Sequence, residues 1–205
     1  MSSDPLNPKT LGSRVSRALL WLMRGWRVET DMVPPERTVM LAVPHTTNLD
    51  GILLILITRS VGLGSSWMVK DFWVKAPFGW LTKRVGAIPV NRRKSNGMVG
   101  QMVERFDTGE PFQLLVPPEG TRGLTEHWKS GFYRIAVEAG VPLTPTYLDY
   151  SRRRAGFLEP ITLTGDMQVD MDAVRAAYPD VKHMARHPEK FGPVRLREES
   201  SPADE

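Results

Sequence analysis

Short apolar runs alternate with segments of helical periodicity along the chain, and this alternation constrains the fold more than any other feature. The runs are bounded by proline, glycine and polar residues, which is typical of strands. Strands are predicted at Thr38–Val43, Ser65–Val69, Ala87–Val90, Pro111–Val116 and Val141–Tyr147. Helices are predicted at Asn48–Thr58, Gly97–Asp107, Trp128–Ala139 and Met171–Tyr178. Strands alternating with helices indicate an α/β fold with a mixed or largely parallel central sheet flanked by helices.

The length of the chain, 205 residues, fits a single domain with a full core. We expect an N-terminal arm and amphipathic helix over residues 1–28, the folded domain over residues 29–180, and a polar C-terminal tail over residues 181–205. The sequence contains no cysteine. This excludes disulfides, thiolate zinc sites and a cysteine nucleophile.

The predicted N-terminal helix, Leu11–Val28, has two possible roles. Its apolar side chains, among them Val15, Leu19, Leu22 and Trp26, follow helical spacing, and its arginines fall mainly elsewhere on the helix. A basic helix of this kind with tryptophan can lie in the interface of an anionic bilayer. The same helix could instead pack on the domain's own core and leave its arginines in water. The sequence leaves both roles open.

Charge and hydropathy indicate which classes of partner and which location in the cell to expect. Lys and Arg outnumber Asp and Glu by 27 to 23, so anionic partners are favoured. No RNA-binding signature or zinc-finger spacing is present, and no nucleic-acid partner is expected. The longest apolar run, Ile52–Ile57, is far short of the roughly 18 residues that a bilayer span needs. With no signal-peptide pattern at the N-terminus, we expect a peripheral protein on the cytoplasmic side of a membrane.

The first motif with chemical content is VPHTTNLD, residues 43–50. His45 stands just past a predicted strand, and Asp50 lies in the first turns of the next helix. If the carboxylate folds back onto the ring, Asp50 accepts a hydrogen bond from one imidazole nitrogen and the other nitrogen can take a proton from an alcohol. Alternatively, His45 is a loop histidine and Asp50 caps the helix. His-x4-Asp alone does not decide between these interpretations.

Two further motifs place cations and a carboxylate after strands. GAIPVNR, residues 86–92, ends in Arg92, and a guanidinium can hold a phosphate bidentately. VPPEGTR, residues 116–122, carries Glu119 and Arg122 at the same edge of the sheet as His45, and Gly120 allows backbone to approach a ligand. Taken singly, each motif is better explained as a surface arginine or a solvated turn than as a binding site.

Together and in this order, these blocks resemble the glycerolipid acyltransferase family, specifically its lysophosphatidate (1-acylglycerol-3-phosphate) acyltransferase branch. The resemblance runs from Val43 to Tyr147 and includes the block GVPLTP, residues 140–145. Four ordered blocks are much more specific than one. The matching residues are His45, Asp50, Gly86, Ile88, Pro89, Arg92, Pro118, Glu119, Gly120, Thr121, Arg122, Val141, Pro142 and Pro145, with Lys70, Pro77, Phe78 and Gly79 resembling an upstream feature. Pro117 departs from the family, which usually has an aromatic residue there.

The resemblance implies an O-acyltransferase whose catalytic residues are His45 and Asp50. His45 would deprotonate a hydroxyl of a lysophospholipid-like acceptor, with lysophosphatidate as the expected one, and the oxygen would attack an acyl thioester. The thioester, from acyl-CoA or acyl carrier protein, is a co-substrate, and neither a cofactor nor a metal is expected. The implied substrate-binding residues are Lys70, Arg92, Glu119, Gly120, Thr121 and Arg122.

Two other functions fit the same residues. A thioester hydrolase would use His45 to transfer the acyl group to water, and it would consume thioester without an acceptor. A non-catalytic lipid-binding protein would keep the fold and would not depend on His45. The two arginines near the motif favour transfer to an anionic acceptor over hydrolysis.

Overall fold

The structure is a computed structural model that describes residues 8, 10–30, 32–70, 79–84, 86–90 and 97–199. Its strands are β1 (Arg27–Val28), β2 (Arg37–Ala42), β3 (Ser66–Lys70), β4 (Ala87–Val90), β5 (Phe112–Val116), β6 (Leu143–Asp149) and β7 (Arg154–Phe157). Its helices are α1 (Leu11–Leu22), α2 (Asn48–Ser60), α3 (Gly79–Arg84), α4 (Gly97–Asp107), α5 (Gly131–Glu138), α6 (Met167–Ala177) and α7 (Val181–Met184). The short 3-10 turns η2 (Pro188–Lys190) and η3 (Arg197–Glu199) follow.

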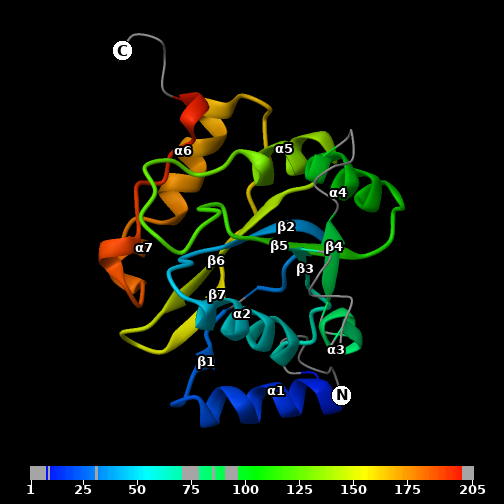
Figure 1. The fold of residues 1–205 in the computed structure, drawn as a ribbon, viewed down its shortest axis with the longest axis vertical. Helices are drawn as coiled ribbons and strands as arrows, with labels where there is room; N and C mark the ends of the chain where they lie inside the picture. Colours follow the sequence, from blue (N-terminus) through cyan, green and yellow to red (C-terminus); the bar gives the residue numbers. More distant parts are fainter. Residues whose placement is uncertain are drawn as a thin grey trace.

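The strands form one mixed sheet in the order β1-β7-β6-β2-β5-β3-β4. Every pairing is parallel except that of β6 with β7, which is antiparallel. In the middle of the sheet, Val39 of β2 pairs with Leu114 of β5 on one side and Leu143 of β6 on the other. The predicted α/β class, with a largely parallel sheet between helices, is confirmed (Figure 1).

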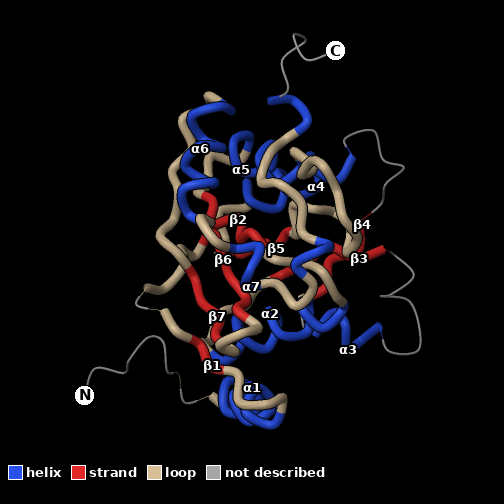
Figure 2. The backbone as a smooth tube through the Cα atoms, turned by 90° about the vertical axis from the view of Figure 1, so that its left-hand side faces the viewer, coloured by secondary structure: helices blue, strands red, loops and turns tan. Residues whose placement is uncertain are grey.

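Each face of the sheet carries its own apolar core. Side chains alternate between the two faces of a strand. Val39 and Leu41 of β2 therefore pack into the core beneath α4, α5 and α6, whereas Met40 and Ala42 pack toward α2. A strand covered on both faces reads as a continuous apolar run, which explains why β2 and β5 were recognisable in the sequence. Figure 2 shows the same layers from the side, with α1 as an additional layer outside α2.

From the two central parallel strands, β2 and β5, the chain continues toward opposite edges of the sheet. After β2 the chain passes through α2 to β3, and after β5 it passes through α5 to β6, on the other side of β2. The helices α2 and α5 cover opposite faces of the sheet (Figure 1). In open α/β sheets such a divergence leaves a crevice at the carboxyl ends of the strands, and ligands bind there. The loops after β2 and β5 are those that carry His45 and Glu119.

Helix α1 packs on α2 through a mixed face, on which Leu20, only 1% exposed, joins the apolar core alongside two buried serines. Ser13 and Ser16 are buried, and the Arg17 guanidinium donates to the main-chain oxygen of Ser60 at the end of α2 (2.8 Å). The apolar face of α1 points outward, with Trp21 72% and Leu22 73% exposed. None of the helices in the described part of the chain is long and apolar enough to cross a membrane.

The segment after residue 180, predicted as a polar tail, is part of the packed molecule as far as residue 199. Val181, Phe191 and Leu196 are buried in the core on the α5 face. Trp128 forms a bridge with Leu196, and Ser130 donates to a carboxylate oxygen of Glu198 (2.6 Å). The segment is polar in composition, but its few large apolar side chains pack in the core and hold it on the domain.

Candidate active site

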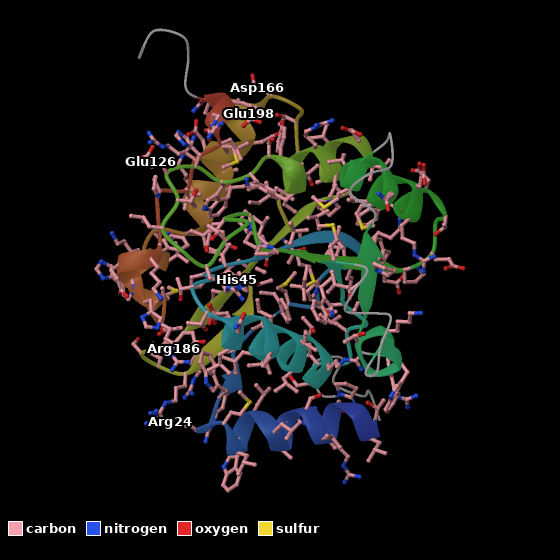
Figure 3. The ribbon with its side chains drawn as sticks, viewed as in Figure 1. Arg24, His45, Glu126, Asp166, Arg186 and Glu198 are labelled. Atoms are coloured by element: carbon pink, nitrogen blue, oxygen red, sulfur yellow. The ribbon has the colours of Figure 1, made fainter. Side chains whose placement is uncertain are left out.

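His45 lies in the loop between β2 and α2, where the central strands end (Figure 3). Its side chain is partly buried, and its Nδ1 atom is buried without a hydrogen-bond partner in the described structure. Burial lowers the pKa of His45, the charge of Asp50 opposes this effect, and the charge of Arg122 adds to it. The imidazole is therefore biased toward its neutral form, which is the form that can accept a proton.

Asp50, the third residue of α2, is fully buried and surrounded by donors. Its Oδ2 atom accepts from the main-chain N–H groups of Thr46 (2.6 Å) and Thr47 (2.7 Å). Its Oδ1 atom accepts from the hydroxyls of Thr47 (2.8 Å) and Tyr150. The hydroxyl of Thr46 lies 3.5 Å from Oδ2. A carboxylate offers about four acceptor positions, so these donors occupy Asp50.

The hydrogen bond predicted between the His45 ring and Asp50 is absent from this structure. Thr47 is the N-cap of α2, and the carboxylate of Asp50 reaches back to its N–H in a capping-box arrangement. The helix-capping alternative is thus correct for the carboxylate's contacts. Asp50 still acts on His45 through its negative charge, which raises the pKa of the imidazole. In this structure, an electrostatic effect of Asp50 on His45 stands in place of the predicted hydrogen bond.

Glu119 supports the main chain of His45. One of its carboxyl oxygens accepts from the His45 N–H (3.1 Å), and its side chain is only 2% exposed. Burial raises the pKa of Glu119 to about 8; the bond from His45 opposes this shift and the charge of Asp50 adds to it. The carboxyl is therefore mainly protonated at neutral pH, and its contact with His45 joins the loops after β2 and β5.

Residues 120–122, which end the VPPEGTR segment, lie at the surface beside His45. Gly120 has φ +65°, a backbone conformation that favours glycine, and a Cβ atom there would require the flexible Lys129 side chain, 2.9 Å away, to move. Thr121 accepts from the N–H of Gly123 (3.2 Å). The exposed guanidinium of Arg122 donates to the Asn48 side chain at the start of α2. The positive charge of Arg122 is close enough to lower the pKa of His45.

The side chains of two predicted binding residues lie outside the described part of the structure. Lys70 is the last residue of β3 and pairs with Val90 of β4, but its side chain lies outside the described residues. Arg92 also lies outside them, as do the neighbouring family positions Pro77 and Phe78. The paired ends of β3 and β4 are at the same edge of the sheet as the end of β5. The roles of Lys70 and Arg92 stay predictions.

Tyr150 was missed from the sequence, although it contacts Asp50 directly. It follows the last residue of β6, and β6 runs parallel to β2, so both strands end at the same edge. This position after a predicted strand was the available signal. It was overlooked because Tyr150 lies beyond the last recognisable block and has no charge to draw attention to it.

Comparisons with known proteins show the family of the chain and a related fold. A family model described as Acyltransferase matches residues 26–149, more than half of the chain. The chain belongs to the acyltransferase family. Its fold is similar to the crystal structure of the 1-acyl-sn-glycerophosphate (LPA) acyltransferase PlsC from Thermotoga maritima, with a TM-score of 0.57 and 16% identity over 85% of this chain and 78% of that one. None of the curated proteins matches the chain. The acyltransferase family model ends one residue before Tyr150.

Proposed function

We propose that this acyltransferase moves a fatty acyl group from an acyl thioester to a hydroxyl of a lysophosphatidate-like acceptor. The observation that carries the proposal is the meeting of His45, Glu119 and Arg122 at one edge of the sheet. A base that is biased toward its neutral form stands there beside an exposed guanidinium. This combination suits an acceptor with both a hydroxyl and an anionic group.

In the proposed reaction, the neutral imidazole of His45 takes the proton of the acceptor hydroxyl as the oxygen attacks the thioester carbonyl. The tetrahedral intermediate then collapses, the carbon–sulfur bond breaks, and the leaving thiolate takes the proton from the imidazolium. An ester and a free thiol result. The negative charge of Asp50 stabilises the imidazolium between these steps. The reaction needs no acyl-enzyme, and acyl-CoA or acyl carrier protein would serve as the donor.

Arg122 is proposed to bind the acceptor's phosphate. In the structure its guanidinium is exposed and contacts Asn48 at the start of α2. The N-terminal end of a helix also favours anions. Lys70 and Arg92, predicted at the neighbouring strand ends, would add positive charge to the same edge.

The test is product analysis by mass spectrometry with an acyl-CoA donor and paired acceptors that differ only in their phosphate. We expect diacyl product from lysophosphatidate. We expect Arg122→Ala to raise the KM for the phosphorylated acceptor by about 10-fold or more and to change that for the unphosphorylated acceptor much less.

Arg134→Ala is the matched control, because Arg134 is also exposed but pairs with Glu138 on α5. Equal KM changes for both acceptors would remove the phosphate role of Arg122. Release of free fatty acid at the same rate with and without acceptor would identify a hydrolase instead.

We propose further that α1 lies against a membrane surface, on the cytoplasmic side. The direction of its apolar face supports this, because Leu20 and Arg17 hold α1 on α2 while Leu11, Trp21 and Leu22 face outward. Of the two roles left open by the sequence, packing and membrane contact, the helix can serve both with different faces. An amphipathic helix in the interface would bring the catalytic edge to substrates that are themselves in the bilayer.

A further inference from the structure

Tyr150 is held in place by two parts of the chain that lie far from it and from each other in the sequence. Its main-chain N–H donates to the oxygen of Met184, at the end of α7 (2.9 Å). Its ring packs edge-to-face on Trp26, with 5.0 Å between the ring centroids. The guanidinium of Arg186 lies over the same ring, 6.0 Å from its centroid. The position of this ring is therefore fixed by α7 and by the segment after α1.

The hydroxyl of this anchored ring donates to Oδ1 of Asp50. Burial raises the pKa of Tyr150, and the Asp50 carboxylate raises it further. The hydroxyl therefore stays protonated and remains a donor over the whole working range of pH. Thr46 and Thr47, the other donors to Asp50, belong to the turn that starts α2. Among the described residues, Tyr150 is the donor to Asp50 that comes from a distant part of the fold.

This hydrogen bond affects the charge that Asp50 presents to His45. A donor on a carboxylate disperses part of its negative charge and weakens its attraction for a nearby cation. The other charged or titratable groups around His45 are Glu119, which binds its main chain, and Arg122, which lowers its pKa. Tyr150 therefore acts on His45 through Asp50 and not by contact.

We propose that Tyr150 is a positioning residue for the His45–Asp50 pair and that the C-terminal segment holds it against the Asp50 carboxylate. This inference rests on the proposed function, because it assigns Tyr150 a part in the basicity of the proposed general base. It also gives residues 184–186 a part in the active site. No recognisable motif reaches that segment.

The variant Tyr150→Phe tests the proposal because it removes the hydroxyl and keeps the ring on Trp26 and the main-chain bond to Met184. With one donor fewer, Asp50 stabilises the His45 imidazolium more strongly, so the pKa of His45 rises. The acidic limb of the pH profile of kcat/KM then moves to higher pH, by about half a unit or more. At pH values on the acidic side of the limb, kcat/KM is about 3-fold or more lower than in the wild type, because a larger fraction of His45 is protonated.

Tyr133→Phe is the matched control. Tyr133 is also buried and its hydroxyl also donates to a carboxylate, that of Asp170 (3.0 Å), but it packs in the core on the opposite face of the sheet from α2. We expect Tyr133→Phe to lower the melting temperature without moving the limb. A limb that stays in place in Tyr150→Phe, or that moves equally in both variants, would overturn the proposal.

A second readout separates this inference from the proposed function. The ring signals of His45 can be followed by NMR against pH without substrate, and they are assigned by their loss in His45→Gln among the four histidines of the chain. A raised His45 pKa in Tyr150→Phe supports the positioning role even if acyl transfer fails. An unchanged His45 pKa contradicts that role even if acyl transfer succeeds.

If Tyr150→Phe does not fold, 3,5-difluorotyrosine at position 150 replaces it. Fluorination keeps the shape of the ring and makes the hydroxyl a stronger donor to Asp50. The His45 pKa and the acidic limb must then move to lower pH. Movement to higher pH, or no movement, would overturn the proposal.

Discussion

Glu119 carries an ionisable carboxyl group in a buried position, where the charged form is disfavoured. Its carboxyl is 2% exposed, and its pKa is raised to about 8. The unfolded chain would ionise this group near its ordinary pKa of 4.5. The folded state therefore holds a proton that the unfolded state releases between these two pH values. The stability that this group contributes is present below pH 4.5 and is lost as the pH rises through 8.

We expect Glu119→Gln to gain stability relative to the wild type as the pH rises. Glutamine resembles the protonated acid and can still accept from the His45 N–H. The difference in the free energy of unfolding should be small at pH 4.5 and reach on the order of 2 kcal/mol or more by pH 8. Urea denaturation at several pH values measures it. Glu126→Gln, at an exposed carboxylate, is the control and should show little pH dependence. A difference that does not grow with pH would show that Glu119 is ionised in the folded protein.

At the residue scale, the sequence predicted which groups meet but not every contact between them. The positions of His45, Glu119 and Arg122 after β2 and β5 followed from strand ends that share one edge. The contacts of Asp50 did not follow, because the capping of α2 and a hydrogen bond from Tyr150 compete for the same oxygens. A spacing of five residues carries no information on that competition.

At the scale of elements, the sequence predicted the strands that read as apolar runs and missed two that do not. The predicted strand Ala87–Val90 matches β4, and the other predicted strands overlap β2, β3, β5 and β6. Two strands at the edge away from β4 were missed. β1 has only two residues, and β7 reads RAGF, which contains no apolar run. Strands of this kind form because neighbouring strands are already in place, and their own residues give little signal.

The prediction at this scale concerns the binding of helix α1 to membranes. We expect the double variant Trp21→Ser/Leu22→Ser to weaken binding to anionic liposomes by about 10-fold or more, because two large exposed side chains are lost from the apolar face. Leu20 stays buried in the core and Arg17 keeps its bond to Ser60, so α1 remains on α2. Sedimentation with liposomes measures the binding.

Leu124→Ser is the control for α1, since Leu124 is 66% exposed but lies in the loop after the VPPEGTR segment. Equal sedimentation of the double variant and the wild type would leave α1 as a packing helix only. An equal loss in Leu124→Ser would mean that liposome binding is not specific to the face of α1.

At the scale of the whole molecule, the site is produced by the topology of the sheet. The chain leaves β2 and β5 toward opposite faces of the sheet, and the loops after these parallel strands, which carry His45 and Glu119, meet at one edge. The predicted class and the order of the blocks were sufficient to infer this arrangement. They were not sufficient to place the segment 181–199, whose few apolar anchors are spread among polar residues. That segment completes the environment of Tyr150 and hence of Asp50.

The central claim is that the His45 imidazole is the base that activates the acceptor hydroxyl. The most direct test is the turnover number of purified His45→Ala with lysophosphatidate and acyl-CoA, beside His183→Ala, which removes an exposed histidine on α7. We expect His45→Ala to lower kcat by about 100-fold or more with an unchanged melting curve, and His183→Ala to leave kcat within about 2-fold of the wild type. Near-normal turnover in folded His45→Ala would contradict the claim.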